Sequence, residues 1–196
     1  MTMRITWTTA AAVALLAMGE TAGAQARHHG GPRMADNPAV GGAAMLATRD
    51  IVDNALLSPD HTTLVAAVKA AGLVPVLKGP GPFTVFAPTN AAFAQLPAGT
   101  VESLLEPRNK AALTGVLTYH VVAGALDAAA IMEAIRAHGG RAVLQTVNGQ
   151  ALVARMNGPR NVVLEDAQGR TVSISTYDVR QSNGIIHVID KVLLPK

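Results

Sequence analysis

The sequence contains no cysteine. This excludes disulfide bonds, a thiol nucleophile and thiolate metal sites, and it leaves no residue for lipid attachment at a bacterial lipoprotein cleavage site. Aromatic residues are also scarce, with one Trp, two Tyr and three Phe in 196 residues. About 150 residues can supply a sufficient hydrophobic core without cross-links. We therefore expect a domain whose core is built mainly from Ala, Val, Leu and Ile.

Charged residues make up only 15% of the chain, with a formal net charge of +3. The basic residues are scattered and are not interleaved with aromatic side chains, so the pattern gives no support for nucleic-acid binding. The signatures G-x-S-x-G, G-x-G-x-x-G and H-E-x-x-H, and the phosphate-binding loop, do not occur. Glu165-Asp166 is expected at a solvated hairpin tip, and His61 and His138 at exposed helix ends. The sequence thus predicts no enzyme, no cofactor and no metal site.

Residues 1–24 have the pattern of a secretory signal peptide, with Arg4 near the start, an apolar run through Met18 and small residues up to Ala24 and Ala26. The apolar run is well short of the roughly 20 residues that a membrane-spanning helix needs. We therefore predict an exported protein, periplasmic or extracellular, without a transmembrane segment. Cleavage after Ala24 is favoured, and cleavage after Ala26 is the alternative.

The second cleavage site would place Arg27, His28 and His29 at a new N-terminus. The free amine, two backbone amides and the imidazole of His29 could then bind Cu(II) or Ni(II) in a square plane. We favour the simpler interpretation, in which these histidines belong to a flexible leader. Residues 25–45 are rich in Gly, Pro and Ala without a period, so the domain is expected to span residues 46–196.

Between about residues 46 and 139 the signals are mostly helical. Ser58, Thr89, Asn109 and Asp127 are each placed to cap a helix N-terminus, and Gly72 is placed to end one. The exception is a strand at residues 83–88, between Gly- and Pro-rich breakers.

After residue 140 the period changes to that of strands. Asn148-Gly149 predicts a two-residue hairpin turn, and residues 167–169 predict a second turn. Because helices precede and strands follow, the predicted fold class is α+β.

His187 lies in the apolar closing strand at the end of the chain. Ile185, His187 and Ile189 point to one face of that strand, and Ile186 and Val188 point to the other. A strand that is apolar on both faces is covered on both sides, and a buried polar group is normally hydrogen-bonded. We therefore interpret His187 as a satisfied core histidine rather than a ligand or catalytic base.

Two segments, FTVFAPTNAAFAQLP (residues 83–97) and SNGIIHVIDKVLLP (residues 182–195), resemble the paired signatures of the fasciclin (FAS1) domain. LTYHVVAG (residues 117–124) resembles that family's Tyr-His segment, and YDVRQSNG (residues 177–184) resembles the lead-in to its second signature. The resemblance implies a single α+β domain, a β-sandwich or wedge with helices packed over one side. It also implies an extracytoplasmic adhesion or interaction protein whose family shares no catalytic residues.

In animal members the Tyr-His segment is tied to integrin binding, which makes Tyr119 and His120 the candidate binding residues. The alternative is structural: the two side chains fix their helix against the sheet through hydrogen bonds. The expected partner is a cell-surface or extracellular matrix protein or polysaccharide, bound by a monomer. A second hypothesis is a periplasmic carrier or sensor for a small apolar ligand, which an apolar pocket of several hundred Å³ would support.

Overall fold

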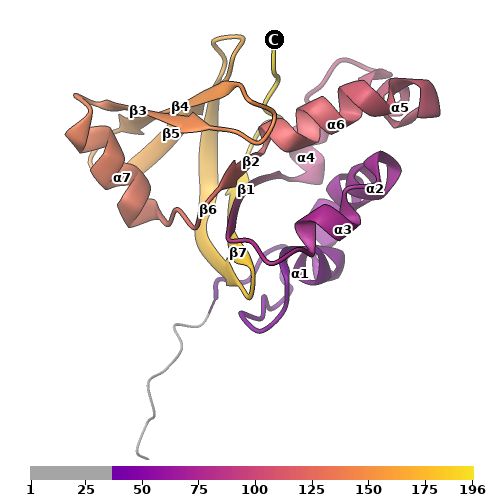
Figure 1. Cartoon of the computed structure of the whole chain (residues 1–196), viewed down its shortest axis with the longest axis horizontal. Coiled ribbons are helices and arrows are strands. Elements are labelled where there is room, and N and C mark those ends of the chain that lie inside the picture. The colour runs from indigo at the N-terminus through magenta and orange to yellow at the C-terminus, as the bar shows by residue number, and fades with distance from the viewer. Residues whose placement is uncertain (1–36) are drawn as a thin grey trace, which may run out of the picture. The chain divides into compact units, whose positions relative to one another are not determined.

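The computed structural model describes residues 37–196 (Figure 1). These residues belong to one unit, Ala35–Lys196. The predicted signal peptide and the Arg27-His28-His29 segment lie outside the described residues. No helix within residues 37–196 is both long enough and apolar enough to cross a membrane.

Short helices dominate the first half of the described chain. Thr89 and Asp127 cap their helices as predicted, because each side chain accepts a hydrogen bond from the backbone N–H three residues later. Gly72 ends a helix in the left-handed conformation (φ 76°). Asn109 occupies the N-cap position of its helix, as predicted, but its side chain donates to Ser103 and makes no capping hydrogen bond. The helices are α1 (Ile51–Leu57), η1 (Pro59–His61), α2 (Thr62–Ala71), α3 (Val74–Leu77), α4 (Asn90–Ala94), α5 (Thr100–Leu105), η2 (Pro107–Asn109), α6 (Lys110–Tyr119) and α7 (Ala128–Ala137).

The described strands form one seven-stranded sheet in the order β2-β1-β7-β6-β5-β4-β3. Only β1 and β7 are parallel; every other neighbouring pair is antiparallel. An isolated bridge between Val122 and Thr146 links the two ends of this order, so the sheet is nearly closed. The strands are β1 (Phe83–Pro88), β2 (Val121–Ala123), β3 (Arg141–Gln145), β4 (Ala151–Asn157), β5 (Asn161–Glu165), β6 (Thr171–Gln181) and β7 (Gly184–Ile189).

The turn between β3 and β4 is longer than predicted. The register pairs Gln145 with Ala151, which leaves residues 146–150 between the strands. Asn148 and Gly149 therefore do not form a two-residue turn by themselves. The side chain of Asn148 accepts hydrogen bonds from the hydroxyl of Thr146 and the backbone N–H of Gln150. These local bonds stabilise the longer loop.

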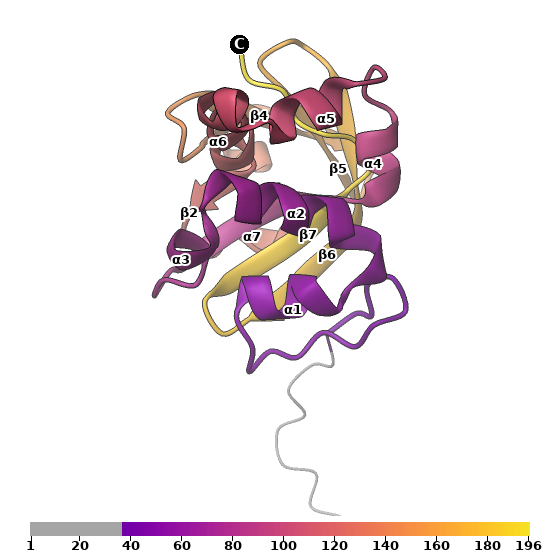
Figure 2. The same cartoon turned by 90° about the vertical axis from the view of Figure 1, so that its right-hand side faces the viewer.

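Two apolar cores lie on either side of the β1–β7 pair. One packs under the N-terminal helices and includes Val68, Leu117 and Ile186; Figure 2 shows α1 and α2 lying in front of β6 and β7. The other includes Phe86 and Ile135 and is covered by α7, which packs on β3 and β4. The fold is mixed α+β, as predicted, and β7 is apolar on both faces because each face contacts one of these cores.

Residues 37–45 pack on the domain, although their composition predicted a flexible leader. Val40 and Met45 are buried. The side chain of Asn37 donates to the backbone oxygen of Arg180 (2.6 Å) and accepts from its N–H (2.8 Å). A Gly-rich turn at residues 41–42 lets the segment fold back and bury these two apolar side chains.

Candidate functional site

The Tyr-His segment lies where α6 ends and β2 begins. Tyr119 is completely buried, with 0% of its surface exposed. Its hydroxyl donates to the backbone oxygen of Ala151 (3.0 Å), which opens β4. Burial raises the pKa of Tyr119 above its usual value of about 10. The phenol therefore acts as a neutral hydrogen-bond donor inside the protein.

His120, at the C-terminal end of α6, is 2% exposed. Its Nδ1 lies 2.8 Å from the backbone oxygen of Val116, and its Nε2 accepts from the N–H of Leu193 (3.0 Å). Because Nε2 accepts a hydrogen bond from an amide, the single ring proton sits on Nδ1 and is donated to Val116. Burial lowers the pKa of His120 to about 4, so the ring is neutral near pH 7.

Neither predicted contact residue is exposed on the surface of this structure. Tyr119 ties α6 to β4, and His120 ties α6 to the segment that follows β7. These bonds match the alternative in which the two side chains fix their helix against the rest of the domain.

Asp166 was predicted to lie at a solvated hairpin tip, but it is buried in the structure. Its side chain is buried and accepts from the backbone N–H groups of Gln168 (3.0 Å), Arg170 (2.9 Å) and Leu194 (3.1 Å). The Arg170 guanidinium forms two further bonds to the same carboxylate, at 2.9 and 2.7 Å. Asp166 is therefore a structural anchor that joins the β5–β6 turn to the C-terminal segment.

The C-terminal segment is fixed from two directions. The carboxylate of Asp166 accepts a hydrogen bond from the N–H of Leu194, and the ring of His120 accepts one from the N–H of Leu193. Arg170 adds a hydrogen bond to the backbone oxygen of Val192 (2.8 Å). One signal for this arrangement was present in the sequence: an aspartate at the start of a turn can accept the N–H groups of the turn itself.

His187 is the satisfied core histidine that the strand pattern predicted. It is 0% exposed, lies 2.8 Å through Nε2 from the backbone oxygen of Leu126, and accepts from the N–H of Asp178 through Nδ1 (3.3 Å). Its ring stacks on Phe86, with the ring centroids 5.6 Å apart. Burial lowers the pKa of His187, so this residue holds the loop before α7 and does not act as an exposed ligand.

The other two histidines within residues 37–196 differ in exposure. His138 is exposed, as predicted. His61 is buried, contrary to the prediction, and its Nδ1 lies 2.9 Å from the hydroxyl of Ser58. Burial lowers the pKa of His61. The error arose because the turn η1 lies beneath the segment at residues 37–45, which covers it: Ser58 also donates to the backbone of Val40. Within residues 37–196, no group of His, Asp and Glu side chains could hold a metal ion.

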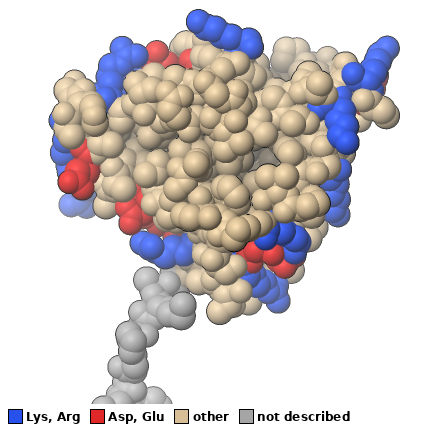
Figure 3. Space-filling model, viewed as in Figure 1, with Lys and Arg blue, Asp and Glu red and all other residues tan. Residues whose placement is uncertain are grey.

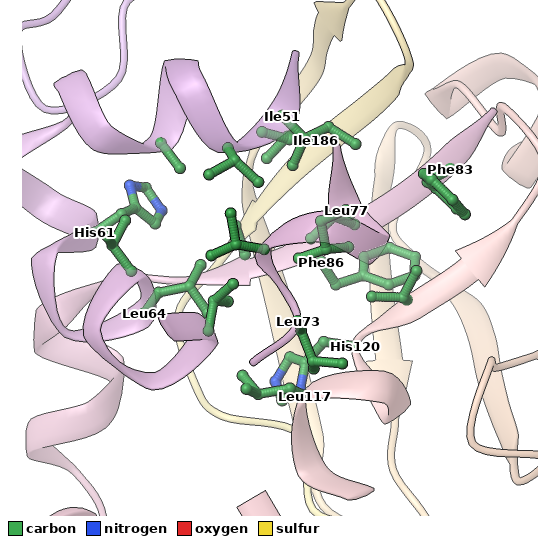
Figure 4. Close-up of a pocket in the computed structure, with 18 of the residues that line it drawn as sticks. Ile51, His61, Leu64, Leu73, Leu77, Phe83, Phe86, Leu117, His120 and Ile186 are labelled. Carbon is green, nitrogen blue, oxygen red and sulfur yellow. The ribbon is translucent and has the colours of Figure 1, made fainter. Parts of the chain in front are cut away.

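An apolar pocket lies between the N-terminal helices and the sheet (Figure 4). It occupies about 80 Å³. Helices α1, α2, α3 and α6 form one side, and β1, β2, β6 and β7 form the other. Its volume is smaller than the several hundred Å³ expected for a carrier of drug-sized molecules. Among the residues that line it are Leu64, Val68, Leu73, Leu77, Leu117 and Val121.

The sequence of this fold matches a known family over most of its length. Residues 59–195 match the family described as the Fasciclin domain. The chain belongs to the fasciclin domain family. Protein sll1483 of Synechocystis sp. is 46% identical over 153 residues, which cover 78% of this chain and 77% of the relative. Immunogenic protein MPB70 of Mycobacterium bovis is 34% identical over 148 residues, 70% of this chain and 65% of the relative.

A solved fasciclin structure shares the fold. The FAS1 domain pair from the insect cell adhesion molecule fasciclin I superimposes with a TM-score of 0.66 at 19% sequence identity. The match covers 74% of this chain and 51% of that chain. The Transforming growth factor-beta-induced protein ig-h3 of Sus scrofa is 36% identical over 134 residues, which cover 68% of this chain and 17% of that protein.

The structure explains why the two fasciclin signatures occur together. They lie far apart in the sequence, but β1 and β7 are parallel neighbours with Phe83 opposite Gly184. A Cβ atom on Gly184 would collide with the carbonyl oxygen of Phe83, so only glycine fits. The side chain of Asn183 accepts from the N–H of Ile51 (3.1 Å) and donates to the oxygen of Leu77 (2.8 Å), so it joins α1 to α3. The signatures are therefore requirements of the fold.

Proposed function

We propose that this fasciclin domain is an exported, non-catalytic interaction module that binds a protein or polysaccharide at a cell surface or in an extracellular matrix. The family match over residues 59–195 carries this proposal. Two relatives support it by name: the insect cell adhesion molecule fasciclin I and the Cell surface glycolipoprotein MPB83 of Mycobacterium bovis, 32% identical over 82% of this chain and 68% of the relative. The signal-peptide pattern at residues 1–24 agrees with export.

The surface suggests where such a partner binds. In Figure 3 the charged side chains lie mainly around the margin of the visible face, and the middle is uncharged. Val143 on β3 is 61% exposed, and Val147 in the loop that follows is 49% exposed. Exposed aliphatic side chains of this kind are typical of contact surfaces when they gather in patches. We therefore place the contact surface along β3 and its loop, and not at the buried Tyr119 and His120.

A binding assay with matched variants tests this function. The purified protein is incubated with washed cells of the organism that produces it, with a matrix fraction and with envelope polysaccharide. The fraction of protein retained on each material is then measured. We expect saturable retention on at least one of these materials. Val143→Asp should reduce the retention at least tenfold without lowering the melting temperature, because this side chain is exposed. Leu56→Asp is the control, since Leu56 is 48% exposed on α1 instead.

Two results would contradict the proposal. Failure of the protein to bind any of the three materials would count against an adhesion role. Equal loss of retention in Val143→Asp and Leu56→Asp would show that added negative charge, rather than this surface, governs retention.

A further inference from the structure

Most of the apolar lining of the pocket beneath the N-terminal helices has no part in the proposed adhesion role. Its walls are mostly aliphatic, and no Asp or Glu lines it; the other lining residues are Ser58, His61, Lys69, Phe83, Phe86, Thr118 and His120. In Figure 4, Leu64, Leu73, Leu77 and Leu117 surround the space in front of Phe86. Apolar cavities of this kind stay dry and bind apolar groups. The wall therefore selects for hydrocarbon.

The volume narrows the class of hydrocarbon. The pocket occupies about 80 Å³, roughly half of the 150 Å³ cavity that holds a benzene molecule in an engineered protein. Typical sites for drug-sized ligands start at about 300 Å³. A benzene-sized ring is therefore too large to fit wholly inside. An unbranched alkyl chain is narrow enough, because it can place its terminal carbons inside and leave the rest at the mouth.

The apolar surface continues from the pocket to the solvent. Among the residues that line the pocket, Val76 on α3 is 54% exposed and Val147 in the β3–β4 loop is 49% exposed. Leu73 and Phe83 also line it and are partly exposed. A hollow is visible right of the centre of the face in Figure 3. A chain that enters the pocket can therefore rest its middle carbons on aliphatic side chains.

The charge of the lining favours an anionic head group. Lys69 on α2 is the one charged residue among those that line the pocket, and it is exposed. A lysine stem can cover apolar surface while its ammonium group stays in water. The ammonium of Lys110 lies close to Gly72, which ends α2 three residues after Lys69. Neither lysine forms an ion pair with a described residue, so both cations are available to a carboxylate.

We propose that the pocket binds a medium-chain fatty acid. The end of the alkyl chain occupies the space among Leu64, Val68 and Leu117, and the carboxylate lies at the mouth beside the ammonium group of Lys69. The site shares Val147 with the proposed adhesion surface, but most of its lining comes from β1, β2, β7 and the helices that cover them, and Val143 does not line it.

A titration of the purified protein with sodium octanoate tests the site. Binding is measured by methyl NMR and by calorimetry. We expect saturable binding at one site, with shifts confined to methyl groups that line the pocket. Octylamine, which has the same chain and the opposite charge, should bind at least tenfold more weakly. 1-Adamantanecarboxylate, which has the same charge on a wide cage, should not enter.

Two pairs of variants separate the chain from the head group. Val65 lines the pocket and is partly exposed, so Val65→Trp should fill the mouth and abolish octanoate binding; Ala66→Trp is the control on the next, exposed position of α2. Lys69→Gln should weaken octanoate binding about threefold to tenfold and reduce its advantage over octylamine. Lys191→Gln removes a distant exposed lysine as the matched control.

The proposal fails if octanoate does not bind at millimolar concentration. It also fails if Val65→Trp binds octanoate as well as Ala66→Trp does, because the chain would then lie elsewhere. Equal binding of octanoate and octylamine would remove the assigned role of Lys69.

Discussion

His120 makes the stability of this fasciclin domain depend on pH in a way that can be calculated. The ring is 2% exposed and neutral, with its proton on Nδ1 and with Nε2 accepting from the N–H of Leu193. Protonation would place a second N–H on Nε2, opposite the N–H of Leu193, and would bury an unpaired charge. The folded protein therefore resists protonation, while the unfolded chain does not.

The magnitude follows from the two pKa values. An unfolded histidine has a pKa of 6.5, and burial lowers the pKa of folded His120 to about 4. Each unit of difference corresponds to about 1.4 kcal/mol, so His120 alone changes the free energy of unfolding by about 3 kcal/mol. Total stabilities of single domains are about 5–15 kcal/mol, so this one group is a large fraction of the whole.

The direction of the effect is fixed by which state binds more protons. Between pH 6.5 and about 4 the unfolded chain binds a proton at this position and the folded protein does not. Stability therefore rises with pH in this window. The contribution is fully present above pH 6.5, is lost progressively as the pH falls toward 4, and changes no further below that. The pKa values of His187 and His61 are also lowered by burial, so they add to the same loss.

Urea unfolding at several pH values between 7.5 and 4.5, in the wild type and in His120→Asn, isolates this contribution. Asparagine does not titrate, and its amide can still donate to Val116. We expect His120→Asn to be less stable at pH 7.5 by about 1–3 kcal/mol, because Leu193 loses its acceptor. Its stability should also fall less steeply toward pH 4.5. Parallel pH curves for the two proteins would refute the argument, since the wild-type loss would then come from other groups.

Three further variants test the structural roles assigned above. His187→Ala should lower the free energy of unfolding by about 1–3 kcal/mol in urea melts without altering retention on cells; lost binding at an unchanged melting temperature would instead make His187 a functional residue. Tyr119→Phe keeps the ring and removes only the bond to Ala151, so it should cost about 1 kcal/mol in the same melts and leave binding unchanged; reduced binding at wild-type stability would revive the contact role. Asp166→Asn should destabilise the domain by about 2 kcal/mol and speed hydrogen exchange at Leu194, whereas unchanged exchange would show that the C-terminal segment is held by other contacts.

Local signals predicted those parts of the fold that depend on neighbours in the sequence. Thr89 and Asp127 cap their helices through N–H groups only three residues away, so a short stretch contains both partners. The alternation in β7 correctly placed His187 inside, because every second side chain of a strand points to the same face. Asn148-Gly149 was located as a turn but not as a five-residue loop, since the register depends on the pairing of β3 with β4.

The packing of residues 37–45 and the burial of Asp166 share one physical cause: each depends on a segment distant in sequence. Asn37 is held by the backbone of Arg180, so no local pattern shows that residues 37–45 are packed. Asp166 is polar and lies beside a glycine turn, which predicts exposure, but the C-terminal segment covers it and donates the N–H of Leu194. Burying a carboxylate costs free energy, and the hydrogen bonds from its partners offset that cost only when all of them are formed in the folded protein.

The sequence by itself determined the class of the fold, the central strands and the caps at Thr89 and Asp127, because periodicity and capping are properties of short segments. The two signatures could also be recognised from their residues alone. Only the tertiary structure decided that Tyr119 and His120 are buried. A side chain on the apolar face of a helix can point to a core or to a partner, and the choice is made by what lies opposite. Here the oxygen of Ala151 and the N–H of Leu193 come from other parts of the chain and complete the hydrogen bonds. Burial without those two partners would be costly, and with them the Tyr-His segment becomes part of the core.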